Sequence, residues 1–132
     1  MLRRIQKWVA GVGLATFLFA GAGAVVSAYY GPWSFDAIVP SFGTPNWYSA
    51  QKTASGNQQY ASISSIGGSY DGAISSWISN SNYSRISPVF DIYSGRTFYY
   101  NSTASKGQLI EYSLETHWWV PVNVEVRGSW GS

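Results

Sequence analysis

The sequence contains no cysteine and only one histidine, His117. Without cysteine, no disulfide can cross-link the fold. Zinc sites that need several nitrogen or sulfur ligands are excluded, and no motif indicates a cofactor. A Ser-His-Asp triad would have to use His117, and the G-x-S-x-G pattern is missing because Gly67-Gly68-Ser69-Tyr70-Asp71 ends in aspartate. We therefore expect a non-catalytic protein.

Charged residues are also scarce, at 11% of the chain. Three of the eight basic residues lie within the first seven positions, which leaves five basic and six acidic residues after residue 28. A nearly neutral domain lacks the basic patch that proteins use to bind nucleic acid or anionic membranes. The composition after residue 28 therefore predicts neither a nucleic-acid partner nor stable insertion into a membrane.

The few carboxylates do not form an evident catalytic pair. Glu111 and Glu115 share one face of an expected strand, where residues four apart are separated by about 13 Å, wider than either glycosidase geometry. We expect both to face solvent. Asp71 and Asp91 lie in or near turns, where aspartate has structural uses. A calcium site in one of these loops remains open, because calcium accepts carboxylate and carbonyl ligands.

The N-terminal segment differs from the rest of the chain. Arg3, Arg4 and Lys7 precede a run without charge from Trp8 to Val26, and Val26-Ser27-Ala28 supplies small residues for cleavage. This order is typical of a secretory signal peptide covering residues 1–28. An uncleaved membrane anchor is the alternative, since about 20 apolar residues can cross a bilayer. We expect cleavage after Ala28 and a secreted, extracellular protein, with the lack of cysteine favouring a bacterial one.

The remaining residues, 29–132, predict a single all-β domain. Serine, glycine and asparagine are frequent, and turn-forming residues recur about every ten positions. We expect an antiparallel two-sheet sandwich of about seven or eight short strands. The expected strands cover residues 34–39, 47–53, 59–66, 73–79, 86–92, 96–100, 108–116 and 118–130.

The last two expected strands show the clearest alternation. In 108–116, Ile110, Tyr112 and Leu114 point to one face. In 118–130 every second residue from Val120 to Val126 is valine, with polar residues or proline between them. The pattern predicts that all four valines (Val120, Val122, Val124 and Val126) face the core. Because sequential strands are usually neighbours, we expect these two strands to pair.

Aromatic residues are unusually frequent, at 17% of the chain. Adjacent strand residues point to opposite faces, so one member of each pair Tyr99-Tyr100 and Trp118-Trp119 should be exposed. Exposed tyrosine and tryptophan rings are typical of binding surfaces. We therefore regard Tyr99, Tyr100, Trp118 and Trp119, with Asn123 as a hydrogen-bonding neighbour, as candidate binding residues. The alternative is that these rings fill the core and cover a sheet edge.

The C-terminal ending Val124-Glu125-Val126-Arg127-Gly128-Ser129-Trp130 resembles that of small exported proteins of Gram-positive bacteria that carry a domain of unknown function. This resemblance covers most of residues 29–132 and supplies no catalytic residues. The chain is also loosely similar, in composition and size, to bacteriocins of the lactococcin-972 kind, which are cysteine-free β-sandwiches. We expect a binding protein that acts on wall glycan or on another protein at the cell surface. The alternative is a secreted antibacterial protein.

Overall fold

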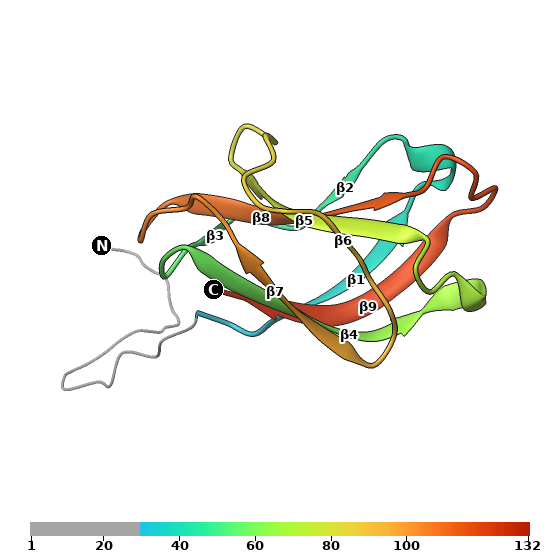
Figure 1. Cartoon of the computed structure of the whole chain (residues 1–132), viewed down its shortest axis with the longest axis horizontal. Coiled ribbons are helices and arrows are strands. Elements are labelled where there is room, and N and C mark those ends of the chain that lie inside the picture. Colours follow the sequence, from blue (N-terminus) through green and yellow to red (C-terminus); the bar gives the residue numbers. More distant parts are fainter. Residues whose placement is uncertain (1–29) are drawn as a thin grey trace.

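The computed structural model describes residues 30–132, which form nine β-strands in two antiparallel sheets and contain no α-helix. The two sheets lie face to face as two layers (Figure 1). The expected signal peptide and its cleavage after Ala28 lie outside the described residues. Within 30–132, no helix is long and apolar enough to cross a membrane.

The first sheet has four strands and the second has five. The first sheet runs in the order β1 (Trp33–Val39), β9 (Val124–Gly131), β4 (Gln58–Ile66) and β7 (Arg96–Asn101). The second runs in the order β2 (Trp47–Tyr48), β8 (Leu109–Thr116), β5 (Ile74–Asn80) and β6 (Phe90–Asp91), and β3 (Lys52–Thr53) also pairs with β8. Two short 3₁₀ turns, η1 (Ser41–Gly43) and η2 (Gly67–Ser69), connect strands.

The all-β, two-sheet prediction is confirmed, but three expected strands, 47–53, 86–92 and 118–130, are several residues shorter than predicted. The expected strand 47–53 is split into β2 and β3. Between them, the Ser49 hydroxyl accepts the Tyr112 backbone N–H at 2.9 Å. In a continuous strand a backbone carbonyl would accept this N–H, so the side chain interrupts the regular pairing. Of the expected strand 86–92, only β6 forms. Pro88 cannot donate a hydrogen bond to a neighbouring strand, and β6 lies at the edge of its sheet, one of the places where a strand tolerates a nearby proline.

The core lies between the layers and follows the alternation of β8. Ile110, Tyr112 and Leu114 are fully buried, as predicted. The four-valine prediction is partly wrong: Val120, Val124 and Val126 are buried, but 46% of Val122 is exposed. The reason is that β9 begins at Val124, so the residues before it form a loop without strand alternation.

The expected pairing of the last two strands is wrong. β8 belongs to the second sheet, whereas β9 lies inside the first sheet between β1 and β4. The chain therefore crosses from one layer to the other between these strands. Gly128 allows β4 to approach β9 closely, because a Cβ atom there would lie 2.3 Å from the Ser62 carbonyl oxygen.

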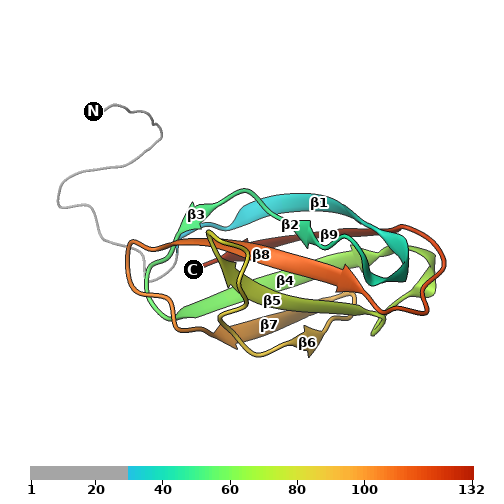
Figure 2. The ribbon, with the colours of Figure 1, turned by 90° about the horizontal axis from the view of Figure 1, so that it is seen from above.

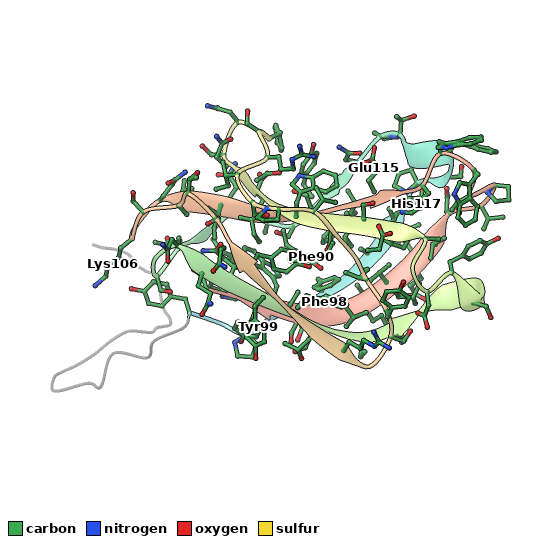
Figure 3. The ribbon with its side chains drawn as sticks, in the orientation of Figure 1. Phe90, Phe98, Tyr99, Lys106, Glu115 and His117 are labelled. Atoms are coloured by element: carbon green, nitrogen blue, oxygen red, sulfur yellow. The ribbon has the colours of Figure 1, made fainter. Side chains whose placement is uncertain are left out.

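A row of aromatic rings crosses the interior. Trp130 stacks on Tyr112 with ring centres 6.1 Å apart, Tyr112 meets Tyr100 edge to face, and Tyr100 meets Phe90 in the same way. Phe90 of β6 also lies against Phe98 of β7, with ring centres 6.4 Å apart (Figure 3). Because β6 and β7 belong to different sheets, these two rings cover the core along that side of the molecule. Large rings thus provide much of the buried area of this small domain.

The outer face of the second sheet is partly covered, which corrects the expectation for Glu111. Only 2% of Glu111 is exposed, and one carboxylate oxygen accepts a hydrogen bond from the Gln51 amide at 3.1 Å. Trp77 is buried on the same face and donates its indole N–H to Ser79. Burial raises the pKa of the Glu111 carboxyl above its ordinary value. Glu115, the other glutamate of this face, is half-buried.

Candidate functional site

The structure brings together three of the five residues that the sequence singled out. Trp118, Trp119 and Asn123 lie in the loop between β8 and β9, at one end of the sandwich. Tyr99 lies on the outer face of the first sheet, away from that end (Figure 3). Tyr100 is fully buried between the layers and cannot touch a ligand. The binding surface that would combine all five residues is therefore not formed.

The tyrosine pair alternates as predicted, but the tryptophan pair does not. Tyr99 is 58% exposed and its neighbour Tyr100 is buried, as expected for adjacent strand residues. Trp118 is 79% exposed and Trp119 is 50% exposed. Both rings leave the core because they belong to a loop, in which the two-face rule of a strand does not apply.

The loop 117–123 is bound to the loop 40–46, and we call the two loops together the tip. The Phe42 backbone N–H donates to the Val120 carbonyl at 2.8 Å. The Ser41 N–H donates to the side-chain oxygen of Asn123 at 3.0 Å. Asn123 therefore holds the two loops together, a role that differs from the ligand contact expected for it.

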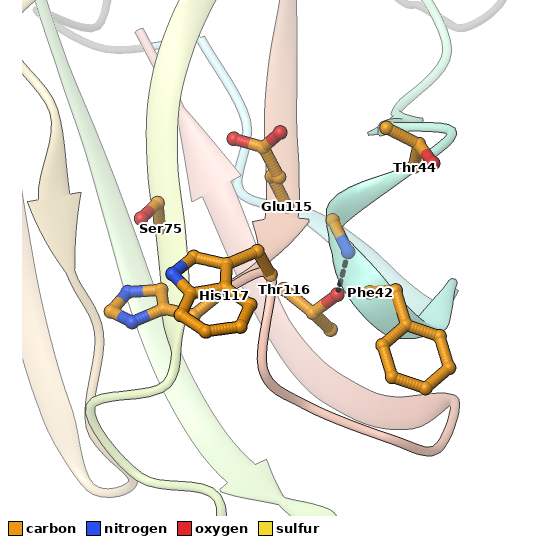
Figure 4. Close-up of a pocket in the computed structure, with 8 residues that line it drawn as sticks. Phe42, Thr44, Ser75, Glu115, Thr116 and His117 are labelled. Atoms are coloured by element: carbon orange, nitrogen blue, oxygen red, sulfur yellow. Dashed lines mark hydrogen bonds between the residues drawn. The ribbon is translucent and has the colours of Figure 1, made fainter.

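A buried threonine completes the connection between the loops. The Thr116 hydroxyl accepts the Gly43 N–H at 2.9 Å (Figure 4) and donates to the Pro40 carbonyl. Gly43 has φ +79°, a conformation that glycine adopts without strain. Phe42 has φ 58°, which is uncommon for an aromatic residue, and its ring is 58% exposed. The hydrogen bonds of Ser41, Phe42 and Gly43 thus fix the backbone in this conformation, from which the Phe42 ring projects into solvent.

A cavity of about 370 Å³, the tip pocket, opens between the loops and the end of β8 (Figure 4). Glu115 projects from β8, and its carboxylate has neither a salt bridge nor a side-chain hydrogen bond within residues 30–132. Two exposed rings, Phe42 and Trp118, contribute apolar surface. The lining residues are Phe42, Gly43, Thr44, Ser75, Glu115, Thr116, His117 and Trp118.

The single histidine lies beside this pocket and is paired with an aspartate. His117 Nε2 lies 3.0 Å from Asp91 Oδ1, and the Ser75 hydroxyl donates to the same oxygen at 3.1 Å. A nucleophilic serine would direct its proton to the imidazole of a histidine. The Ser75 proton is directed to the Asp91 carboxylate instead. The His117 ring also meets the Trp119 ring edge to face, with centres 5.8 Å apart. The contact between His117 and Asp91 thus joins the loop 117–123 to β6.

The loop aspartates make hydrogen bonds to serine. Asp71 Oδ1 accepts both the backbone N–H and the hydroxyl of Ser94, at 3.0 and 2.7 Å. In the part of the chain that the structure describes, no group of three or more His, Asp or Glu side chains is placed to hold a metal ion. The calcium site that the sequence left open therefore has no ligand cluster of this kind among residues 30–132.

A second concavity, of about 520 Å³, lies between the edges of the two sheets, and we call it the edge groove. β1, β2 and β3 run along one long side of the molecule, opposite the side formed by β6 and β7 (Figure 2). The groove is lined by Pro32, Trp33, Ser34, Phe35, Asp36, Trp47, Ser49, Ala50, Lys52 and Trp130.

Sequence reasoning missed both concavities, for different reasons. Phe42 stands between serine and glycine in an expected loop, so its exposure could have been inferred from the sequence. The approach of Glu115 to Phe42, and of Trp47 to Trp33, depends on strand pairing and on the packing of the sheets. No local pattern indicates these approaches.

No protein-family model matches this chain, and neither a curated protein nor a solved structure matches it. Its function is therefore inferred from the residues of the tip pocket and the edge groove.

Proposed function

We propose that this chain is a secreted, non-catalytic saccharide-binding protein of the bacterial cell surface, and that the tip pocket holds one sugar unit of a wall glycan. One observation carries the proposal: two exposed aromatic rings, Phe42 and Trp118, border a pocket that contains the uncommitted carboxylate of Glu115. The basic and apolar segment of residues 1–28 supports export.

The chemistry of the tip pocket suits a sugar. A pyranose ring has C–H faces that pack on an aromatic ring and hydroxyl groups at its rim that need partners. Trp118 supplies a wide ring with an exposed surface. The Glu115 carboxylate accepts hydrogen bonds from ligand hydroxyls, and such charge-assisted bonds are stronger than neutral ones. Thr44 and Ser75 add hydroxyl groups around the same space.

The rigidity of the tip also favours binding. Two hydrogen bonds join the two loops, and two more join the loop 40–46 to Thr116 at the end of β8, so the backbone that carries Phe42 is fixed before any ligand arrives. A preformed site loses less conformational freedom on binding than a mobile one. The volume of about 370 Å³ lies in the lower part of the range found for small-molecule sites, which fits one sugar ring and not a long chain segment.

The test compares two tryptophans of one loop. The full chain is titrated with a neutral oligosaccharide of N-acetylglucosamine and sedimented with purified peptidoglycan. Trp118→Ala removes a ring that lines the pocket and should weaken binding about tenfold or more. Trp119→Ala removes an exposed ring outside the lining and serves as the matched control. Glu115→Gln should also weaken binding, because the charged acceptor is lost.

Two results would contradict the proposal. The first is that the unmutated chain binds neither the oligosaccharide nor peptidoglycan. The second is that Trp118→Ala and Trp119→Ala reduce binding equally, since this outcome would indicate a general effect of exposed rings. Tyr99→Ala, on the outer face of the first sheet, should leave binding unchanged.

A further inference from the structure

The edge groove differs from the tip pocket in its residues and in its charge. Its floor consists of rings from both sheets: Trp33 and Phe35 from β1, Trp130 from β9 and Trp47 from β2. Trp130 is buried, whereas the other three rings are only half-buried. Phe35 lies 5.6 Å from Trp47 between ring centres, so the groove spans the gap between the two layers. A ligand in this groove would cover aromatic surface that the sandwich leaves partly open.

Lys52 places a positive charge over this floor. Its ammonium group lies 5.6 Å from the centre of the Trp33 ring, a cation–π distance. Among residues 30–132, Lys52 forms no salt bridge with an acidic side chain. The side chain is half-buried, so its charge is less screened than that of a fully exposed lysine. An ammonium held by a ring and lacking a carboxylate partner remains available to an anionic group.

The acidic residue of the groove is already paired. Asp36 lies 3.4 Å from the Arg127 guanidinium, on the neighbouring strand β9. Arg127 also contacts Glu125, at 3.1 Å. The Arg127 guanidinium thus contacts two carboxylates, and this group of three side chains carries one net negative charge. Lys52 is therefore the cation of this groove that is left to bind an incoming anion.

We infer that the edge groove is a second binding site, and that it takes a sugar bearing a carboxylate. The sugar ring lies on the exposed surfaces of Trp33 and Trp47, and its carboxylate pairs with the Lys52 ammonium. The hydroxyl of Ser34 lies in the same lining and suits a ring hydroxyl of the ligand. This site uses none of the tip residues, so it stands even if the tip pocket binds nothing.

An added peptide strand fits this edge less well. Pro32 and Pro40 bracket β1, and Asp36 lies at its middle. Proline and charge are features by which edge strands avoid pairing with another chain. A ligand that uses ring surfaces and hydroxyls, and not a row of backbone groups, is therefore the better occupant.

The experiment uses two ligands with the same sugar rings, one with charged carboxylates and one with neutral methyl esters. The full chain is titrated calorimetrically with an oligogalacturonate and with its methyl ester, which has the same rings but no carboxylate. The acid should bind about tenfold more tightly than the ester. Lys52→Gln should remove that preference, and Lys52→Arg should retain it. Lys106→Gln removes an exposed lysine that does not line the groove, so it is the matched control and should change neither affinity.

Further variants separate this site from the tip pocket. Trp47→Ala should weaken the binding of both acid and ester, whereas Trp118→Ala should weaken neither. Added salt should weaken the acid more than the ester, because it screens the ion pair. Thermal unfolding of each variant shows that the fold is intact.

The inference is overturned if the ester binds as tightly as the acid, if neither binds, or if Lys52→Gln keeps the preference. Tighter binding of an acidic peptide than of the oligogalacturonate would assign the groove to a protein partner and would also overturn it. Loss of oligogalacturonate binding in Trp118→Ala would place the acid in the tip pocket and reject the groove. The proposed function of the tip pocket is tested separately. It fails if the chain binds neither the neutral N-acetylglucosamine oligosaccharide nor peptidoglycan.

Discussion

The phenol oxygens of Tyr100 and Tyr112 lie 3.1 Å apart in the core, and the two residues belong to different sheets. Tyr100 also contacts the Ser76 hydroxyl at 2.6 Å, and Ser76 donates to the Phe90 carbonyl. Because Ser76 has only one hydroxyl proton, Tyr100 donates to Ser76 and Tyr112 donates to Tyr100. This directed chain of hydrogen bonds satisfies three buried hydroxyls and connects the two layers.

Tyr100→Phe should destabilise the protein by about 1–3 kcal/mol, because it leaves the Tyr112 hydroxyl buried without its acceptor. The adjacent Tyr99→Phe removes an exposed hydroxyl and should change the free energy of unfolding by less than about 0.5 kcal/mol. Chemical denaturation measures both values. Equal losses in the two variants would show that the hydroxyl chain contributes nothing specific.

Stability should fall in alkaline solution. Burial raises the pKa of Tyr100 from 10.0 to about 12, and burial raises that of Tyr112 well above its ordinary value too. Below pH 10 both residues are protonated in the folded and unfolded chain, so their contribution is complete. As the pH rises from 10 toward 12 the unfolded chain releases these protons first, so the free energy of unfolding decreases.

Denaturant unfolding at a series of alkaline pH values measures this dependence. Tyr112→Phe should be less stable at neutral pH, because the hydrogen bond to Tyr100 is lost, but its stability should fall less steeply with pH because one buried titrating group is gone. A slope identical to that of the unmutated chain would contradict the assignment.

The two valines that flank the start of β9 should respond differently to a charge. Val124 is 2% exposed, so Val124→Asp buries an unpaired carboxylate and should destabilise the protein by more than about 3 kcal/mol. Val122 is 46% exposed, and Val122→Asp should change stability by less than about 0.5 kcal/mol. Thermal unfolding compares them directly. If Val122→Asp proved as damaging as Val124→Asp, residues 118–123 would have to pack as a strand.

Glu111→Gln should stabilise the protein at neutral pH. One carboxylate oxygen of Glu111 is buried without a hydrogen-bond partner, and burial raises its pKa above 4.5. The favourable, protonated form is present below pH 4.5, and this contribution is lost as the pH rises through the raised pKa. Glutamine keeps the shape without ionising. Melting temperatures should therefore differ at pH 7 and converge in acid, and a constant difference at all pH values would contradict the explanation.

Alternation in the sequence was sufficient to identify most strands and the buried face of β8. Ile110, Tyr112 and Leu114 alternate with smaller or polar residues, and their burial follows from strand geometry. The alternation also indicated an exposed tyrosine next to a buried one. These predictions succeeded because they depend on residues close together in the chain.

Predictions failed where they depended on distant segments. The four valines imitate a strand, yet hydrogen bonds between the loop 40–46 and the loop 117–123 place Val120 inside and leave Val122 outside. Glu111 looked solvent-facing because its covering, which includes Gln51, comes from a loop 60 residues away in sequence. Among the residues that line the tip pocket, the sequence identified Trp118 as a candidate binding residue. No pattern in the sequence indicated that Glu115 lines the same pocket.

The position of β9 inside the first sheet has a consequence for the order of folding. Among the strands of residues 30–132, β9 is the only one that pairs with β1, whereas β4 pairs with both β7 and β9, so β1 cannot join the first sheet until residues 124–131 are available. Pairing of β1 with β9 closes a loop of more than 80 residues, and such non-local contacts slow folding. A chain truncated before Val124 would therefore keep the β4–β7 pair but would leave β1 without a partner strand.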